Sequence, residues 1–234
     1  MSKNKKEISD KKILYMKGLN NELSYYSTVN RKPPKNAIKI FLFMFGGIIL
    51  AKHRKIVNKN IGWINGKRGY ESFIDSSVYE IIHHGSFFVN GGKFRHYNSI
   101  FTIFNRLERW KIFFRSLVDF FSFDITHFSY WIEFCFLYQA ITTLSPLAIA
   151  TPHIQDRHAT WLSYYAYENN ISFNIYQHGI TPDMDYLPHK IYCTNFYALD
   201  EKQVEINRKI IILNPKQCFF HKLQFNSVLK FSKL

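Results

Sequence analysis

The sequence predicts an α/β protein with a Rossmann-like parallel sheet flanked by helices. Between residues 146 and 181, a short apolar run, a helical segment and a second apolar run follow one another. Two strands joined by a helix pair in parallel through a right-handed crossover. The chain has 234 residues, of which 47% are hydrophobic, so it is long and apolar enough for a substantial core.

The first segment, residues 1–36, is expected to be basic and partly flexible. Residues 1–12 are rich in charge and read as a frayed tail, and residues 13–19 are interpreted as a short strand turned at Gly18. Pro33 and Pro34 then break regular structure. A Rossmann-like domain of the acceptor type is expected over residues 37–208.

The most hydrophobic segment is residues 40–51, IFLFMFGGIILA, which lysines and an arginine flank on both sides. Twelve uncharged residues are too few to cross a bilayer as a helix, which needs about 20. Two interpretations remain open: a monotopic element that meets acidic lipid head groups, or a buried core element with basic ends.

Residues 100–138 are rich in aromatic side chains and are expected to form two or three helices. Arg106, Arg109, Lys111 and Arg115 alternate there with phenylalanines and Trp110. Arginines mixed with aromatic rings bind nucleic acid in some proteins. At helical spacing, a core face opposite a solvated basic face is the more frequent arrangement, and it is favoured here.

The central unit is expected to contain a strand at 146–150, a helix at 159–168 and a second strand at 171–176. Pro152 stops the first strand, and Asp156 is well placed to cap the helix. Beyond it, residues 190–197 and 209–213 are expected to be strands and residues 200–207 a helix. Residues 209–234 are read as the start of a second domain or a C-terminal tail.

The net charge indicates which class of partner the protein binds, and the cysteine content indicates its redox compartment. The formal net charge of +14 favours an anionic partner such as a membrane surface, nucleic acid or a phosphorylated substrate. Three widely spaced cysteines without a CxxC pair indicate a reducing compartment and no zinc site.

Polar side chains follow both strands of the central unit. In an open parallel sheet, ligands bind beyond the carboxyl ends of the strands. We therefore expect one site, with catalytic and substrate-binding side chains. The catalytic candidates are His178 as general base and Asp156 as its orienting group or an alternative base. The substrate-binding candidates are His153, Arg157, Gln177 and Gly179.

Two other interpretations of these residues stay open. Asp156 is also explained by capping alone, and His178 by hydrogen bonding at a turn. A metal hydrolase using His153, Asp156, His158 and His178 is disfavoured, because no HxH or HExxH spacing occurs.

The strand, the polar DR loop, the helix and the segment ISFNIYQHGIT together resemble bacterial surface-polysaccharide glycosyltransferases of the GT-B fold. These include capsule, teichoic-acid polymerase and sialic-acid polymer enzymes. The resemblance covers about 35 residues well. It implies the N-terminal half of a GT-B fold, with most of the C-terminal donor domain lacking, and it makes His178 the active-site histidine.

The resemblance implies transfer of a sugar, in one version sialic acid, from a nucleotide sugar to a lipid-linked glycan. The protein would be cytoplasmic and peripheral on the inner face of the cell membrane, with other polysaccharide-synthesis proteins as partners. No cofactor is expected beyond the donor substrate, and no nucleic acid. The first alternative is a non-catalytic assembly or acceptor-binding component of the same machinery. A further alternative, a nucleic-acid-binding protein, rests on the net charge and on the arginine- and aromatic-rich segment alone.

Overall fold

The computed structural model describes residues 3–28, 45–65, 70–84, 86–88, 94–96, 99–154, 156–181, 188–210 and 212–223. The chain divides into two compact units. Unit 1 comprises Met1–Met16, Lys32–Val57 and Ile82–Ser145. Unit 2 comprises Lys17–Arg31, Asn58–Ile81 and Pro146–Leu234, and it carries every predicted site residue.

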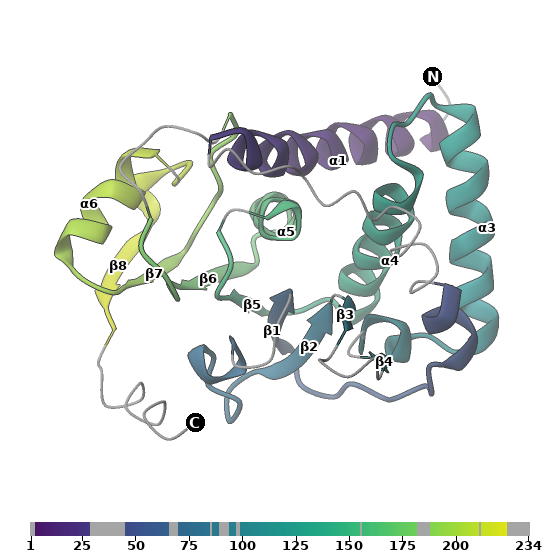
Figure 1. Cartoon of the computed structure of the whole chain (residues 1–234), viewed down its shortest axis with the longest axis horizontal. Coiled ribbons are helices and arrows are strands. Elements are labelled where there is room, and N and C mark those ends of the chain that lie inside the picture. Colours follow the sequence, from purple (N-terminus) through teal and green to yellow (C-terminus); the bar gives the residue numbers. More distant parts are fainter. Residues whose placement is uncertain are drawn as a thin grey trace. The chain divides into compact units, whose positions relative to one another are not determined.

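A six-stranded, all-parallel sheet confirms the predicted fold class (Figure 1). The strand order is β2-β1-β5-β6-β7-β8. The strands are β1 (Asn60–Asn65), β2 (Glu80–His84), β5 (Ala148–Thr151), β6 (Ser172–Tyr176), β7 (Asn195–Ala198) and β8 (Phe219–Lys222). A separate antiparallel pair joins β3 (Ser86–Phe88) and β4 (Phe94–His96). The described residues also form 3₁₀ turns, namely η1 (Tyr70–Phe73), η2 (Ser99–Ile103) and η3 (Pro215–Gln217).

The strand order reverses between β1 and β5. The chain passes from β1 to β2 at one edge and then returns to β5 on the other side of β1. The carboxyl ends of β1 and β5 therefore flank a topological switch point, which is where open α/β sheets bind their ligands.

The central unit forms as predicted. Strands β5 and β6 pair in parallel, with Ala148 opposite Ser172 and Thr151 opposite Ile175. Helix α5 (Arg157–Glu168) joins them and lies against the sheet (Figure 1). Its N-cap is Asp156, whose side chain accepts a hydrogen bond from the Ala159 amide.

Unit 1 contains the two helices expected in the aromatic-rich segment. They are α3 (Arg106–Ser122) and α4 (Phe128–Leu144), which pack against each other. Asn105 and Glu108 form a capping box at the start of α3. The Trp131 indole donates to the Ser116 carbonyl at 3.1 Å, so a buried hydrogen bond joins the helices.

The strand expected at residues 13–19 is wrong, because these residues lie inside helix α1 (Lys3–Thr28). Buried positions in α1 include Tyr15, Leu19 and Glu22, a spacing of four and three residues that is typical of a helix face. Gly18 does not turn the chain. A Cβ there would lie 2.2 Å from Trp161 Nε1, so the glycine allows α5 to approach closely within unit 2.

The strand expected at 209–213 is also wrong. Helix α6 (Glu201–Ile210) extends into it, and Ile212 makes only a single parallel bridge to Ile191. The strand expected at 190–197 is present as β7, which is shorter and begins only at Asn195. Further along the chain, β8 adds to the same sheet beside β7.

Two other sequence-based expectations fall partly outside the described residues. These are the boundary after residue 36 and the first part of the apolar segment, residues 40–44. Residues 45–50 of that segment are helical. Among the described residues, none of the helices combines the length and the apolar character needed to cross a membrane.

Candidate functional site

The candidate site lies in unit 2, at the carboxyl ends of β5 and β6. The loop after β5 carries His153, and the loop after β6 carries His178. Strand β5 also borders the switch point. Both histidines therefore lie at the carboxyl ends of the strands, where a ligand is expected.

His178 is held by the loop that follows β5. Its Nδ1 lies 2.5 Å from the carbonyl oxygen of Pro152. A carbonyl oxygen only accepts hydrogen bonds, so Nδ1 carries the proton and Nε2 is the nitrogen with basic character. The ring is partly exposed and packs edge-on against His153, with ring centroids 5.4 Å apart, and against Phe73, at 6.1 Å.

The His153 side chain is largely buried, with 12% of it exposed. Burial lowers its pKa from 6.5 to about 4, with smaller opposing and supporting effects from Asp156 and from its histidine neighbours. The ring is therefore neutral at pH 7. It thus adds no positive charge beside His178.

Asp156 occupies the start of α5. Its Oδ1 accepts from the Ala159 amide at 2.8 Å, and its Oδ2 lies 3.8 Å from His153 Nδ1. The carboxylate thus caps the N-terminus of α5 and lies beside His153. The hydrogen bond that orients His178 comes from Pro152 instead.

Arg157 points into the interior of unit 2. Its Nη1 donates to both carboxylate oxygens of Glu22, at 2.6 and 2.7 Å, and both side chains are buried. The Arg157 backbone amide also donates to Glu22 Oε2, at 3.1 Å. This geometry favours a positioning role, in which Arg157 fixes the start of α5 rather than contacting a substrate.

Gln177 is fully buried beneath the second loop. Its Nε2 donates to the Gly179 carbonyl at 2.8 Å and to Gln203 Oε1 at 2.5 Å, and its Oε1 accepts from the Leu199 amide at 3.1 Å. These bonds tie the loop after β6 to the start of α6. Gly179 itself is exposed, and a Cβ added there would meet no atom within 4 Å.

The predicted site residues therefore divide into two groups. His153, Asp156, His178 and Gly179 lie in the two loops or at their ends, whereas Arg157 and Gln177 support those loops from within. The structure adds Phe73, Pro152 and Glu22, which sequence reasoning missed. Glu22 lies 135 positions from Arg157 along the chain, and no local pattern reports such a contact.

A row of stacked rings crosses the sheet on the same carboxyl side. Tyr176 and Tyr197 stack with their centroids 4.4 Å apart, and Tyr197 stacks on His221 at 4.9 Å. The three side chains come from β6, β7 and β8 and are in register. Because Tyr176 and His221 cover the two faces of Tyr197, the row presents mainly ring edges to its surroundings.

Other chemistries find less support among the described residues. In that part of the chain, no group of three or more His, Cys, Asp or Glu side chains is arranged to hold a metal ion. Burial raises the pKa of the Cys135 thiol to about 12 and raises that of Cys193 strongly, which disfavours either as a thiolate nucleophile.

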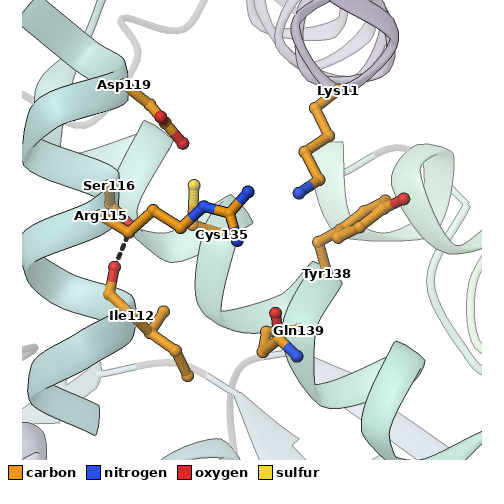
Figure 2. Close-up of a pocket in the computed structure, with 8 residues that line it drawn as sticks. All are labelled: Lys11, Ile112, Arg115, Ser116, Asp119, Cys135, Tyr138 and Gln139. Atoms are coloured by element: carbon orange, nitrogen blue, oxygen red, sulfur yellow. Dashed lines mark hydrogen bonds between the residues drawn. The ribbon is translucent and has the colours of Figure 1, made fainter. Parts of the chain in front are cut away.

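A small pocket lies in unit 1, between α1, α3 and α4 (Figure 2). Lys11 and Arg115 point into it from opposite sides, above Tyr138 and Gln139. Both cations also lie near Glu7, at 2.7 and 3.8 Å. The volume of about 40 Å³ is far below the roughly 300 Å³ of small ligand pockets, so this pocket suits ordered water rather than a sugar or nucleotide.

Comparison of the chain with protein-family models, with curated proteins and with solved structures gave no match.

Proposed function

We propose that this chain is a glycosyltransferase-like protein that uses His178 to activate an acceptor hydroxyl. The observation that carries the proposal is the position of His178. It is partly exposed at the carboxyl edge of a Rossmann-like sheet, and Pro152 directs its Nδ1 inward. The resemblance of the segment ending in Gln177, His178 and Gly179 to surface-polysaccharide transferases supplies the reaction class.

In the proposed step, the acceptor hydroxyl oxygen forms a bond to the anomeric carbon of the donor sugar. The bond between that carbon and the phosphate oxygen of the nucleotide breaks, and the nucleotide leaves with the electron pair. The hydroxyl proton passes to His178 Nε2, which is the basic nitrogen when Nδ1 donates to Pro152. General base catalysis of this kind contributes about 10²- to 10⁴-fold to a rate.

The other predicted residues take graded roles. Neutral His153, the predicted substrate-binding histidine, packs against the His178 ring, and Asp156 holds the loop beside it. Arg157 and Gln177 position the two loops through Glu22 and Gln203. Gly179 leaves open space next to His178, where a sugar can approach.

The proposed donor is a nucleotide sugar, with cytidine-linked sialic acid as one candidate, and the proposed acceptor is a lipid-linked glycan. Capsular or other surface polysaccharide synthesis is the corresponding process. The proposed location is the inner face of the cell membrane, where such acceptors are made, together with other polysaccharide-synthesis proteins.

The test is transfer of radiolabelled sugar from a panel of nucleotide sugars to lipid-linked acceptors, by the full chain with and without membrane extract from the source cells. We expect transfer by the wild type and at least a 100-fold lower rate for His178→Ala. His53→Ala is the matched control, because His53 is exposed and belongs to unit 1. A transfer rate unchanged in His178→Ala would refute the assignment.

The assembly-component alternative predicts a different result. In that case, no nucleotide sugar supports turnover, yet the chain still binds the lipid-linked glycan. Acceptor binding that persists in His178→Ala, without transfer by the wild type, would favour this alternative.

A further inference from the structure

Helix α3 in unit 1 exposes an apolar face on the side opposite its core contacts. Its buried residues are Arg109, Phe113, Ser116 and Asp119. Large apolar side chains occupy the other side: Leu107, Phe114, Val118 and Phe121 are 65%, 57%, 64% and 78% exposed. At about 3.6 residues per turn, these four positions fall within an arc of about 60°. A solvated helix normally carries polar side chains there.

The helical residues 45–50 continue this apolar surface. Phe45 packs edge-on against Trp110, with ring centroids 5.8 Å apart, and Trp110 stacks on Phe114 at 5.6 Å. Ile49 follows Phe45 by one helical turn and is partly exposed, and Leu50 is 65% exposed. Helix α3 and the helical residues 45–50 are in contact and together present one aromatic and aliphatic surface, which we call the α3 face.

The buried side chain of Arg109 joins α3 to the helical residues 45–50. Its guanidinium Nη1 donates to the carbonyl of Gly47, at 3.1 Å, and to that of Ala51, at 2.5 Å. Both carbonyl groups lie in the last turn of the helical residues 45–50, where the Gly47 carbonyl also accepts from the Ala51 amide at 3.1 Å. The buried arginine therefore fixes the orientation of the exposed apolar side chains above it.

Exposed basic side chains border the α3 face. Lys111 and Arg115 lie along one side of it on α3, and Arg106 lies at the start of the helix. Lys52, Arg54 and Lys55 follow residues 45–50 directly and are also exposed. The acidic residues of α3 are Glu108, which is used in the capping box, and Asp119, which is buried. Glu7 of α1 lies 3.8 Å from Arg115, and the other border side chains named here are cationic, so the border carries a net positive charge.

From this combination, we propose that the α3 face docks on an anionic lipid surface, with the apolar side chains in the interface and the basic border against acidic head groups. Exposed aromatic and aliphatic side chains beside Lys and Arg are typical of interfacial helices. A second copy of the chain fits this face less well, because each copy has a formal net charge of +14 and brings the same basic border.

The inference supplies a surface for the membrane location in the proposed function, but it stands on different residues. Vesicle binding is measured without a donor or an acceptor. A chain that binds vesicles but transfers no sugar would refute the proposed function alone, and a chain that transfers sugar to a soluble acceptor but ignores vesicles would refute this inference alone.

Tryptophan fluorescence gives a direct test, because Trp110 is the partly exposed tryptophan of the chain. The other three, Trp63, Trp131 and Trp161, are 1%, 0% and 0% exposed. We expect the wild type to sediment with vesicles that contain phosphatidylglycerol. Brominated lipid in those vesicles should quench the fluorescence of the wild type and of Trp161→Phe, but not that of Trp110→Phe.

Surface variants separate the apolar and electrostatic contributions. Phe114→Ser/Phe121→Ser should lower the vesicle partition coefficient at least tenfold. The matched control is Leu147→Ser/Phe219→Ser, which changes side chains that are 71% and 67% exposed in unit 2, and it should bind as the wild type does. Lys55→Gln/Lys111→Gln should reduce binding by about fivefold for each charge removed, and salt should reduce that difference.

Three outcomes would overturn the proposal. One is wild-type protein that stays in the supernatant with phosphatidylglycerol vesicles. Another is Phe114→Ser/Phe121→Ser protein that keeps wild-type circular dichroism and wild-type vesicle binding. The third is a wild-type dimer in light scattering that this variant converts to a monomer, without vesicle binding, which would assign the α3 face to a second copy.

Discussion

Glu22 and Arg157 form a buried ion pair in which Arg157 Nη1 lies 2.6 and 2.7 Å from the two carboxylate oxygens of Glu22. The same carboxylate accepts from the Arg157 backbone amide, at the N-terminus of α5. One glutamate from α1 therefore neutralises a buried cation and satisfies an amide at the helix end. The loop that carries His153 ends where α5 begins. The position of this loop therefore depends on the ion pair between Glu22 and Arg157.

Removal of one partner should destabilise unit 2 strongly. Glu22→Ala leaves the Arg157 charge buried, and we expect the free energy of unfolding to fall by about 3 to 5 kcal/mol in urea titrations. The control is Glu7→Ala, which breaks the partly exposed pair with Lys11 and should cost about 1 kcal/mol or less. Equal losses in the two variants would contradict the importance of the buried pair.

The low pKa of His153 predicts a pH dependence of stability. The folded protein holds this imidazole neutral down to a pH of about 4, whereas the unfolded chain takes up the proton near 6.5. The unfolded state binds more protons between these values, so the free energy of unfolding falls as the pH is lowered from 6.5 to 4. The contribution of His153 amounts to about 3 kcal/mol at most.

His153→Gln should remove this contribution. Urea titrations at several pH values should show a shallower decrease for His153→Gln than for the wild type over that range. His53→Gln changes an exposed histidine and should reproduce the wild-type profile. The prediction fails if His153→Gln and the wild type lose stability in parallel.

Gln177 supports the loop of His178 through buried hydrogen bonds. Gln177→Leu leaves the Leu199 amide and the Gly179 carbonyl without the side chain they bond, and we expect a loss of about 2 to 4 kcal/mol in unfolding free energy. Gln217→Leu alters an exposed glutamine and should stay within about 0.5 kcal/mol of the wild type. A small effect at Gln177 would show that the loop is held by other contacts.

The sequence predicted the central unit well because its signals are local. The apolar runs, Pro152 and the capping residue Asp156 lie within a few positions of the elements they define, and β5, α5 and β6 follow them. The prediction for α1 failed because Gly18 normally disfavours a helix interior. A glycine is needed at position 18 because Trp161 packs closely against it. Trp161 lies 143 positions further along the chain, so no local sequence pattern indicates this contact.

The candidate site shows the same division. The two loops and their histidines were found from their positions after apolar runs. The partners that determine what each side chain does were not found. Glu22 engages Arg157, Pro152 orients His178, and Gln203 engages Gln177. Each contact depends on how the strands and helices pack.

Substitution of Gly18 should reduce stability, whereas substitution of Gly179 should leave stability unchanged and affect ligand binding. The comparison of the two variants tests the candidate site. At Gly18, an added Cβ would lie 2.2 Å from Trp161 Nε1 and 2.8 Å from the Arg157 carbonyl oxygen, which is backbone and cannot move aside alone. We expect Gly18→Ala to lower the free energy of unfolding by about 1 to 3 kcal/mol, because overpacking forces α1 and α5 apart.

At Gly179, an added Cβ meets open space, so Gly179→Ala should leave the unfolding free energy within about 0.5 kcal/mol of the wild type. If a sugar approaches the backbone beside His178, the same methyl group should nevertheless reduce transfer or ligand binding at least tenfold. Stability is measured in urea, and ligand binding by calorimetry with nucleotide sugars. Normal stability with normal binding in Gly179→Ala would move the ligand away from this loop, whereas normal stability with impaired binding would place it there, because no contact within the protein explains the loss.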